Sequence, residues 1–186
     1  MSVLSVSVSS THSFSKSPVP AITLLEDLGV KGDAHAGVNV QHLSRTHITP
    51  PPRNLRQVHL IHSEVLTEAA NGTPLTYGAL GENITTSGID LLALGQGTKL
   101  RFVDASSGTV PAGAPVISVT GLRNPCPQID KYRAGLKERF FVRDSERKIV
   151  GRKAGIMAVV EVGGEVRPGM RIVVEKPASH TPLECV

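Results

Sequence analysis

The sequence predicts a mainly β fold, a closed or nearly closed β-barrel with a few short peripheral helices. Short apolar segments recur along 186 residues, and 18 glycines with 13 prolines suit strands joined by tight turns. Aromatic residues make up only 3% and there is no Trp, so Val, Leu, Ile and Ala must fill the core. A closed barrel would leave no sheet edge unpaired. We expect one domain over residues 1–176 and a frayed tail over 177–186.

The strands are predicted from β-branched or alternating apolar residues that begin or end at glycine turns. The hairpin-like signal Gly95-Gln96-Gly97 joins two of these segments. Another begins after Glu82 and Asn83, and Gly121 is expected to end the segment before it. The predicted strands are residues 3–8, 21–25, 56–61, 84–86, 89–94, 99–103, 116–120, 156–162 and 171–175.

Two regions have helical spacing. Ser63 has the character of an N-cap, an apolar stripe follows it, and Asn71-Gly72 is a stop signal. Residues 127–140 carry apolar side chains three and four positions apart, which predicts one amphipathic helix or two short ones. A charged segment, 141–148, comes next.

Charge and cysteine content narrow the function classes. Residues 123–153 hold ten Lys or Arg against four acids, which indicates an anionic ligand or partner or else a solvated helix face. Nucleic-acid binding is not expected, because there is no binding motif and few aromatic side chains could stack on bases. No apolar run approaches the ~20 residues of a membrane span. The two cysteines give no disulfide framework, so we expect a reducing, cytoplasmic location.

Cys126 stands out because Pro125 and Pro127 flank it at the end of a predicted strand. Proline restricts both its own backbone and that of the residue before it, which predicts a stiff, non-helical turn. Arg123 could favour the thiolate, as could the first turn of a helix that follows, and a thiolate attacks electrophiles and binds soft metals. Taken alone, the local sequence favours a small apolar cysteine that fills the core.

Two further loops carry polar candidates. Gly32-Asp33-Ala34-His35-Ala36-Gly37 predicts a backbone that approaches a ligand closely, with His35 as a metal ligand, proton carrier or anion donor. The same loop is also consistent with a turn held by Asp33. Glu82 and Asn83 could orient a ligand at a strand entrance, but the residues alone favour a capped turn. His42 and His47, in the polar loop 41–53, are expected to face solvent.

Four separated motifs, in this order, resemble the MOSC domain, named after the C-terminal domain of molybdenum cofactor sulfurase. They are the residue 32–37 loop, residues 81–91, Thr120-Gly121-Leu122-Arg123-Asn124-Pro125-Cys126, and the closing strands 155–160 and 164–172. The resemblance covers nearly the whole chain, including the Phe14-Ser15-Lys16 loop. Gly169-Met170 departs from the Gly-Asp of many relatives, in what should be barrel scaffold.

The resemblance implies a pocket with a molybdopterin-type cofactor. Cys126 would ligate molybdenum or carry sulfur as a persulfide, and His35 would manage protons. The cofactor would contact Lys16, Asp33, Glu82, Asn83 and Arg123. The resemblance to the MOSC domain outweighs the interpretation of Cys126 as a cysteine that only fills the core. Pyridoxal phosphate is not expected, because it belongs to a sulfurase domain for which this chain has no room.

The resemblance leaves two functions open. One is an enzyme that reduces N-hydroxylated compounds with a separate electron-transfer partner. The other is a sulfur carrier or cofactor-handling module that receives sulfur on Cys126 from a cysteine desulfurase partner. In both cases the ligand is a small molecule or a cofactor.

Overall fold

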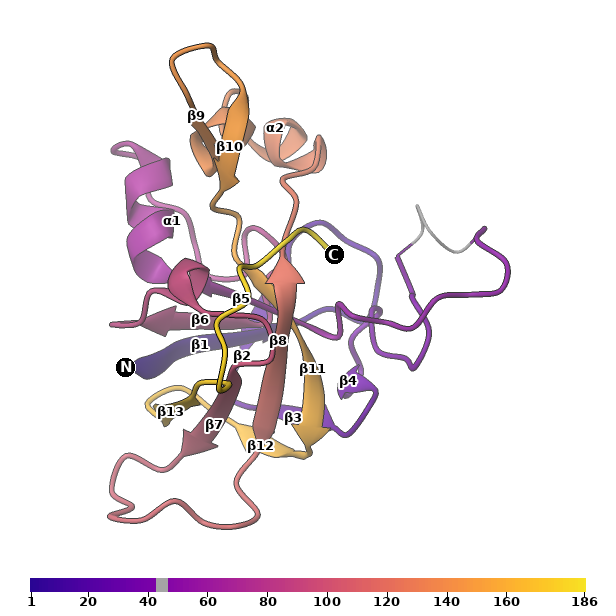
Figure 1. Ribbon diagram of the computed structural model, residues 1–186, viewed down its shortest axis with the longest axis vertical. Helices are drawn as coiled ribbons and strands as arrows, with labels where there is room; N and C mark the ends of the chain where they lie inside the picture. Colours follow the sequence, from indigo (N-terminus) through magenta and orange to yellow (C-terminus); the bar gives the residue numbers. More distant parts are fainter. Residues whose placement is uncertain (43–46) are drawn as a thin grey trace.

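A computed structural model describes residues 1–42 and 47–186, and within them a β-barrel forms the body of the molecule (Figure 1). The barrel strands are β1 (Ser2–Val8), β5 (Val58–His62), β6 (Ile84–Ser87), β7 (Lys99–Val103), β8 (Val116–Leu122), β11 (Ile156–Val162) and β13 (Arg171–Glu175). The peripheral elements are β2 (Ser17–Val19), β3 (Ile22–Leu25), β4 (Gly29–Val30), α1 (Ser63–Ala70), the 3₁₀ turns η1 (Leu91–Ala93) and η2 (Lys137–Phe140), α2 (Gln128–Tyr132), β9 (Phe141–Arg143), β10 (Ile149–Arg152) and β12 (Gly164–Val166).

The described strands close the barrel in the order β13-β7-β8-β11-β5-β6-β1, and β1 returns to pair with β13. The closing pair joins Ser2 to Arg171. All neighbours are antiparallel except β5 and β6, which run parallel with Leu60 opposite Ile84. The strand β2 adds to the outside of β1, and β12, β3 and β4 form a separate small sheet. The predicted mainly β barrel with short peripheral helices is therefore confirmed.

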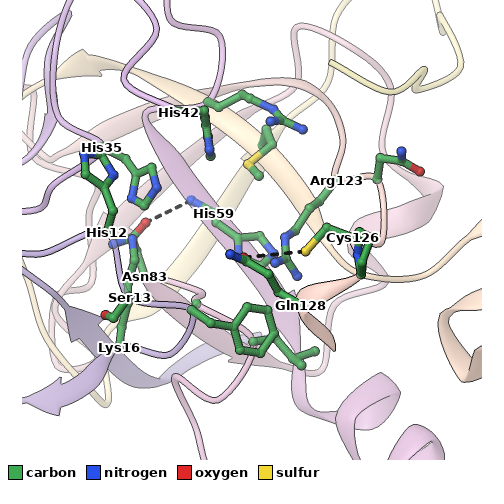
Figure 2. A pocket seen from close by; sticks show the side chains of 17 residues that line it. His12, Ser13, Lys16, His35, His42, His59, Asn83, Arg123, Cys126 and Gln128 are labelled. Atoms are coloured by element: carbon green, nitrogen blue, oxygen red, sulfur yellow. Dashed lines mark hydrogen bonds between the residues drawn. The ribbon is translucent and has the colours of Figure 1, made fainter. Parts of the chain in front are cut away.

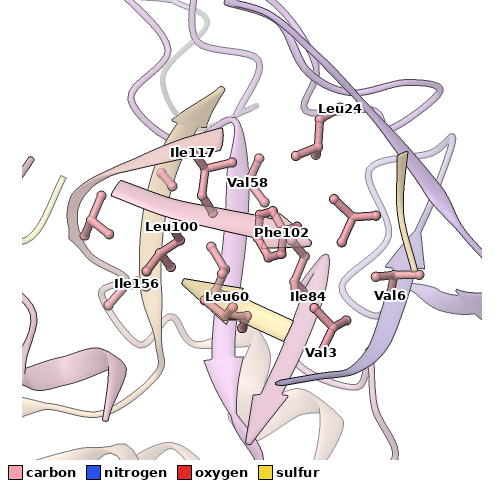
Figure 3. Packing of buried hydrophobic residues seen from close by; sticks show 14 of the residues in the cluster. Val3, Val6, Leu24, Val58, Leu60, Ile84, Leu100, Phe102, Ile117 and Ile156 are labelled. Atoms are coloured by element: carbon pink, nitrogen blue, oxygen red, sulfur yellow. The ribbon is translucent and has the colours of Figure 1, made fainter. Parts of the chain in front are cut away.

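The barrel interior is apolar, and alternation along the strands explains which side chains enter it (Figure 3). In β5, Val58 and Leu60 point into the barrel core, whereas Ile61 belongs to a second apolar cluster outside it. All five residues of β5 are buried, so this strand is covered on both faces. Its outward-facing positions can therefore line a site between the barrel wall and the loops.

The second apolar cluster joins α1 to the segment that follows β8. Leu66 of α1 packs in it with Ile129, Leu136 and Phe140. These three residues anchor what we call the basic lobe, residues 128–153, which comprises α2, η2, β9 and β10. Figure 1 shows this lobe beyond the end of β8, away from the barrel. The two short helical pieces were predicted, but the β9–β10 hairpin within the charged segment was not.

Several local predictions are wrong. Residues 89–94 do not form a strand, because the Asp90 carboxylate accepts from the backbone N–H groups of Leu92 and Ala93 and caps a 3₁₀ turn. The helix α1 begins at Ser63, but the N-cap position is His62 and no side chain caps it. Strand β8 continues through Gly121 to Leu122.

The C-terminal residues explain why β8 continues. The backbone N–H of Leu122 donates to Glu184 O at 2.7 Å, and a Cβ on Gly121 would lie 2.4 Å from the same oxygen. The strand thus uses glycine to admit a neighbouring segment. The prediction of a frayed end is wrong here, because residues 184–186 lie along β8.

The loop between β4 and β5 returns to its own base, where Asn39 and Arg53 form a bridge. Asn54 holds this base by donating to the backbone oxygens of His35 (2.9 Å) and Gly37 (3.0 Å). Part of the predicted exposed loop, residues 43–46, lies outside the described residues. Among the residues that are described, no helix has the length and apolar character to cross a bilayer.

Candidate functional site

A pocket of about 450 Å³ lies against the outer face of the barrel at β5 and β11 (Figure 2). His59 and Met157 are cross-strand partners and form its floor. Figure 2 shows His12, His35 and His42 on one side, Arg123, Cys126 and Gln128 on the other, and His59 between them. The lining residues are His12, Ser13, Phe14, Lys16, His35, His42, Arg56, His59, Leu80, Gly81, Asn83, Arg123, Asn124, Cys126, Pro127, Gln128 and Met157.

Cys126 is half-buried and presents its thiol to this pocket. The turn between Pro125 and Pro127 carries it there, and α2 begins directly afterwards, with the N–H of Ile129 donating to Cys126 O at 3.1 Å. The thiol makes a weak contact with Gln128 Oε1 at 3.9 Å. The predicted stiff, non-helical presentation of the thiol thus matches the geometry, although α2 spans only five residues.

Arg123 extends from the end of β8 into the same pocket. Its Nη1 atom is buried and has no hydrogen-bond partner among the described residues. The guanidinium lies 6.0 Å from the centre of the Phe14 ring. Burial lowers the pKa of Arg123, and nearby Cys126 and Glu82 partly offset this effect. A buried cation with an unused donor favours an anionic ligand, because an unpaired buried donor is costly.

Asp33 organises the opposite wall without lining the pocket itself. Its Oδ2 atom lies 2.6 Å from Lys16 Nζ and accepts from Asn83 Nδ2 at 2.9 Å. Burial alone would raise the pKa of Asp33, but the hydrogen bond from His35 and the charge of Lys16 outweigh it and hold that pKa well below its usual range. Asp33 is therefore ionised, and it fixes three side chains that do reach the pocket.

Burial lowers the pKa of Lys16, although the negative charges of Asp33 and Glu82 favour its protonated form. The ion pair between Lys16 and Asp33 is almost fully shielded, with 4% and 2% of the side chains exposed. The two charges compensate each other, so Lys16 adds little net charge to the pocket. Arg123 contributes more, because no carboxylate lies within ion-pair distance of it in the described chain.

The Asp33 carboxylate also fixes the orientation of the His35 ring. Its Nδ1 atom lies 3.1 Å from Asp33 Oδ1, and an ionised carboxylate can only accept, so the proton sits on Nδ1. This leaves Nε2 as the ring atom that can take or give a proton. The ring contacts His12 at 5.1 Å and His42 at 4.5 Å between centroids. His42 is half-buried at the pocket wall, so the expectation that it faces solvent is wrong.

His59 is buried, and burial followed by the charge of Arg123 lowers its pKa well below the usual range. It is therefore neutral, and its Nε2–H donates to Ala154 O at 2.9 Å. Its backbone N–H donates to Asn83 Oδ1 at 3.2 Å (Figure 2). His59 thus ties the pocket floor to the Asp33 network.

Glu82 faces its own loop rather than the pocket. Oε1 accepts from the N–H of Gly78 (2.6 Å) and from Thr85 Oγ1 (3.3 Å), and Oε2 accepts from the N–H of Leu80 (3.0 Å). Burial raises the pKa of Glu82. The loop it braces touches the Phe14 loop, where Ser15 Oγ donates to Ala79 O at 2.8 Å. The carboxylate therefore supports the pocket wall indirectly.

Five of the seven sequence-predicted site residues line the pocket: Lys16, His35, Asn83, Arg123 and Cys126. Of the ten Lys and Arg residues in 123–153, only Arg123 lines it, so one side chain of that segment can bind an anionic ligand in this pocket. Sequence reasoning missed Phe14, His59 and Gln128 as lining residues. The outward position of His59 in a strand covered on both faces was the signal that could have identified it.

The described residues contain no group of three or more His, Cys, Asp or Glu side chains able to hold a metal ion. A metal in this pocket would therefore take most of its ligands from a cofactor. The residues fit a cofactor of that kind in two respects: Cys126 offers a soft sulfur donor, and the unpaired Nη1 of Arg123 offers a donor to an anionic group.

Comparison with protein-family models matches residues 34–173 to the MOSC domain. Among solved structures, the YuaD protein from Bacillus subtilis superposes with a TM-score of 0.73 at 23% identity, covering 95% of this chain and 96% of that one. YiiM from Geobacillus stearothermophilus gives 0.63 at 15% identity, over 98% of this chain and 78% of that one. YiiM from Escherichia coli superposes with a TM-score of 0.59 at 17% identity, covering 98% of this chain and 73% of that one. These structures share the fold. No curated protein matches the chain.

Proposed function

Because the chain belongs to the MOSC domain family, a family associated with the molybdenum cofactor, we propose that its pocket binds a molybdopterin-type cofactor with Cys126 as a metal ligand. The observation that carries this proposal is that one pocket contains both the half-buried thiol of Cys126 and a buried Arg123 donor with no hydrogen-bond partner. Molybdenum in such cofactors takes thiolate sulfur, and the pterin phosphate is anionic.

Each pocket residue would have a definite task. Cys126 would bind the metal, and Arg123 would bind the anionic phosphate. Asn83 and Lys16, both fixed by Asp33, would shape the opposite wall. When bound, the group would supply a metal centre that exchanges electrons.

We further propose that the reaction is the reduction of an N-hydroxylated compound by a separate electron donor. The N–O bond breaks, two electrons come from the donor, two protons are taken up, and an amine and water leave. His35 suits the delivery of a proton, because it lines the pocket and Asp33 holds Nδ1–H, which leaves Nε2 as the ring atom that can exchange a proton. Phe14, Leu80 and Met157 provide apolar surface that would limit water around the substrate.

Molybdenum content tests cofactor binding without relying on activity. The protein would be produced in a host that makes the cofactor, and metal would be measured in wild type, Cys126→Ser and Cys185→Ser. We expect near-stoichiometric molybdenum in wild type and in Cys185→Ser, whose thiol lies in the exposed C-terminal segment. Cys126→Ser should lose at least about tenfold, because even supporting residues of metal sites cost 10–100-fold. Equal metal in all three proteins, or none in wild type, would contradict the proposal.

A second function is favoured by the accessibility of the thiol. Cys126 is half-exposed in an open pocket, so another protein's persulfide could reach it. In that transfer the Cys126 thiolate attacks the terminal sulfur of a desulfurase persulfide, a new S–S bond forms on Cys126, and the donor thiolate leaves. Mass spectrometry after incubation with a cysteine desulfurase and cysteine should then show one added sulfur atom, present in Cys185→Ser and absent in Cys126→Ser.

A further inference from the structure

The basic lobe carries a large excess of unpaired positive charge. Its sequence holds nine Lys or Arg and four acids. Three bases form ion pairs, Arg143 with Glu138, Lys148 with Glu146, and Lys153 with Glu68 of α1. Within the described chain, the six others form none: Lys131, Arg133, Lys137, Arg139, Arg147 and Arg152.

Exposed apolar side chains lie among these charges. Four of the eleven exposed large hydrophobic residues of the described chain belong to this lobe: Tyr132, Val142, Ile149 and Val150. Val150 is the most exposed of all eleven, at 62%. It lies where the register of the β9–β10 pair shifts. Exposed apolar side chains bordered by polar ones often mark a site that binds another macromolecule.

The lobe is also attached to the pocket. Arg152, at the end of β10, donates from Nε to Asn124 Oδ1 at 3.1 Å, and Asn124 lines the pocket. The lobe begins two residues after Cys126. A macromolecule seated on the lobe would therefore lie next to the pocket.

The kind of partner follows from the mixture of surface types. The hairpin connection contains Asp144 and Glu146, which oppose insertion of its tip into an anionic membrane. A nucleic acid would bind the Lys and Arg side chains through its phosphates but would leave the aliphatic side chains uncovered. An acidic protein can match both, with carboxylates around an apolar centre.

We infer that the basic lobe docks an acidic electron-transfer protein beside the Cys126 pocket. This inference rests on the proposed reductive function, which requires a separate electron donor. Electron-transfer complexes are small and transient, so a compact lobe is large enough. The unpaired basic side chains would steer the encounter, and Val150, the most exposed apolar side chain, would make the apolar contact.

The test is binding of two acidic electron-transfer proteins, a flavodoxin and a [2Fe–2S] ferredoxin, measured by calorimetry at low ionic strength. The charge variant is Lys131→Glu/Arg139→Glu, and the apolar variant is Val150→Asp. Lys31→Glu/Lys176→Glu makes the same change in net charge at exposed sites outside the lobe, and Val110→Asp places an acid on an exposed valine elsewhere. Circular dichroism would verify that each variant is folded.

We expect micromolar binding of at least one probe, weakened about tenfold or more by either lobe variant and by physiological salt, and retained in both controls. The inference is overturned if neither probe binds, or if lobe and control variants bind alike. It is also overturned if the lobe variants lose binding to duplex DNA or to phosphatidylserine vesicles while binding to the acidic proteins is unaffected. Molybdenum content of the lobe variants should equal wild type, which separates failure of docking from failure of the proposed cofactor site.

Discussion

Lys16 Nζ lies 2.6 Å from Asp33 Oδ2 in a part of the molecule that excludes almost all solvent. One member of the pair enters from the loop before β2, and the other from the loop after β4. Asp33 also holds His35 and Asn83. A single carboxylate therefore fixes the geometry of the pocket wall opposite Cys126.

Breaking this pair should be costly. We expect Lys16→Met and Asp33→Asn each to reduce the free energy of unfolding by about 3–5 kcal/mol, because each leaves a buried group uncompensated. The double variant should cost less than the sum of the two, which urea denaturation can measure as a coupling energy. The exposed pair Lys99–Glu161 has the same 2.6 Å separation and should couple by less than about 1 kcal/mol. Equal coupling in the two pairs would contradict this account.

The carboxylate of Glu82 accepts three hydrogen bonds, and its amide counterpart cannot. In Glu82→Gln, an NH₂ group must face a backbone N–H or the Thr85 hydroxyl, so one donor loses its acceptor. We expect a loss of about 1–3 kcal/mol in urea denaturation. Glu161→Gln, at a partly exposed position, is the control and should change stability by less than about 0.5 kcal/mol. A similar effect in both variants would show that Glu82 does not brace its loop.

Cys126 should react with iodoacetamide in the folded protein, since its side chain is half-exposed in an open pocket. Cys185→Ser isolates this thiol, and intact mass spectrometry would count the added groups. Modification only after denaturation would instead indicate a buried, inert cysteine. Cys126→Ser should retain the single reactive thiol of Cys185, which confirms that the reagent is in excess.

The buried, neutral His59 predicts that stability falls with acidification. Its pKa is lowered in the folded state, so the unfolded chain binds the extra proton below about pH 6.5, and the free energy of unfolding decreases there. One such group accounts for about 1 kcal/mol between pH 7 and 5.5. His62, whose pKa is also lowered by burial, adds in the same direction. Urea denaturation of His59→Gln should show a smaller pH dependence than wild type or His12→Gln, which replaces an exposed histidine.

Gly155 holds the pocket floor together and should not tolerate a side chain. It has φ +94°, and a Cβ there would lie 2.2 Å from Leu60 O and 2.8 Å from His59 Nε2. Gly169 has a similar φ of +86°, but nothing lies within 4 Å of its Cβ position. Gly169→Ala should therefore cost about 1 kcal/mol from backbone strain alone, and Gly155→Ala clearly more. Thermal unfolding of the two variants provides the comparison.

The strands could be predicted where local pattern and tertiary environment agree. β1, β7, β11 and β13 each have β-branched or alternating residues beside a turn, and each lies where expected. The segment around Asp90 misled because its apolar residues suit a strand, whereas one capping carboxylate stabilises a turn. Gly121 was wrongly predicted to end its strand. The glycine is needed because the backbone oxygen of Glu184 lies too close for a Cβ, and Glu184 is 63 positions away in the chain.

The candidate site residues were predicted from motifs, and what the motifs could not predict has a physical cause. Motifs named Cys126, Arg123 and His35, because those residue types carry chemistry. They could not show that Glu82 faces its own loop, or that Phe14 lies under the Arg123 guanidinium. Such relationships depend on which loops meet in space, and neither residue spacing nor composition contains that information.

The pairing of β1 with β13 also determines when the fold can be completed during synthesis. Ser2 pairs with Arg171 of β13, so the chain up to Arg171 must leave the ribosome before the ring of strands can close. Until then, β1 can pair with β2 and β6, but its edge toward β13 stays open. Contacts so distant in sequence slow folding, and an unpaired edge invites pairing with another nascent chain. For this protein, the interval before closure is when aggregation competes most strongly with folding.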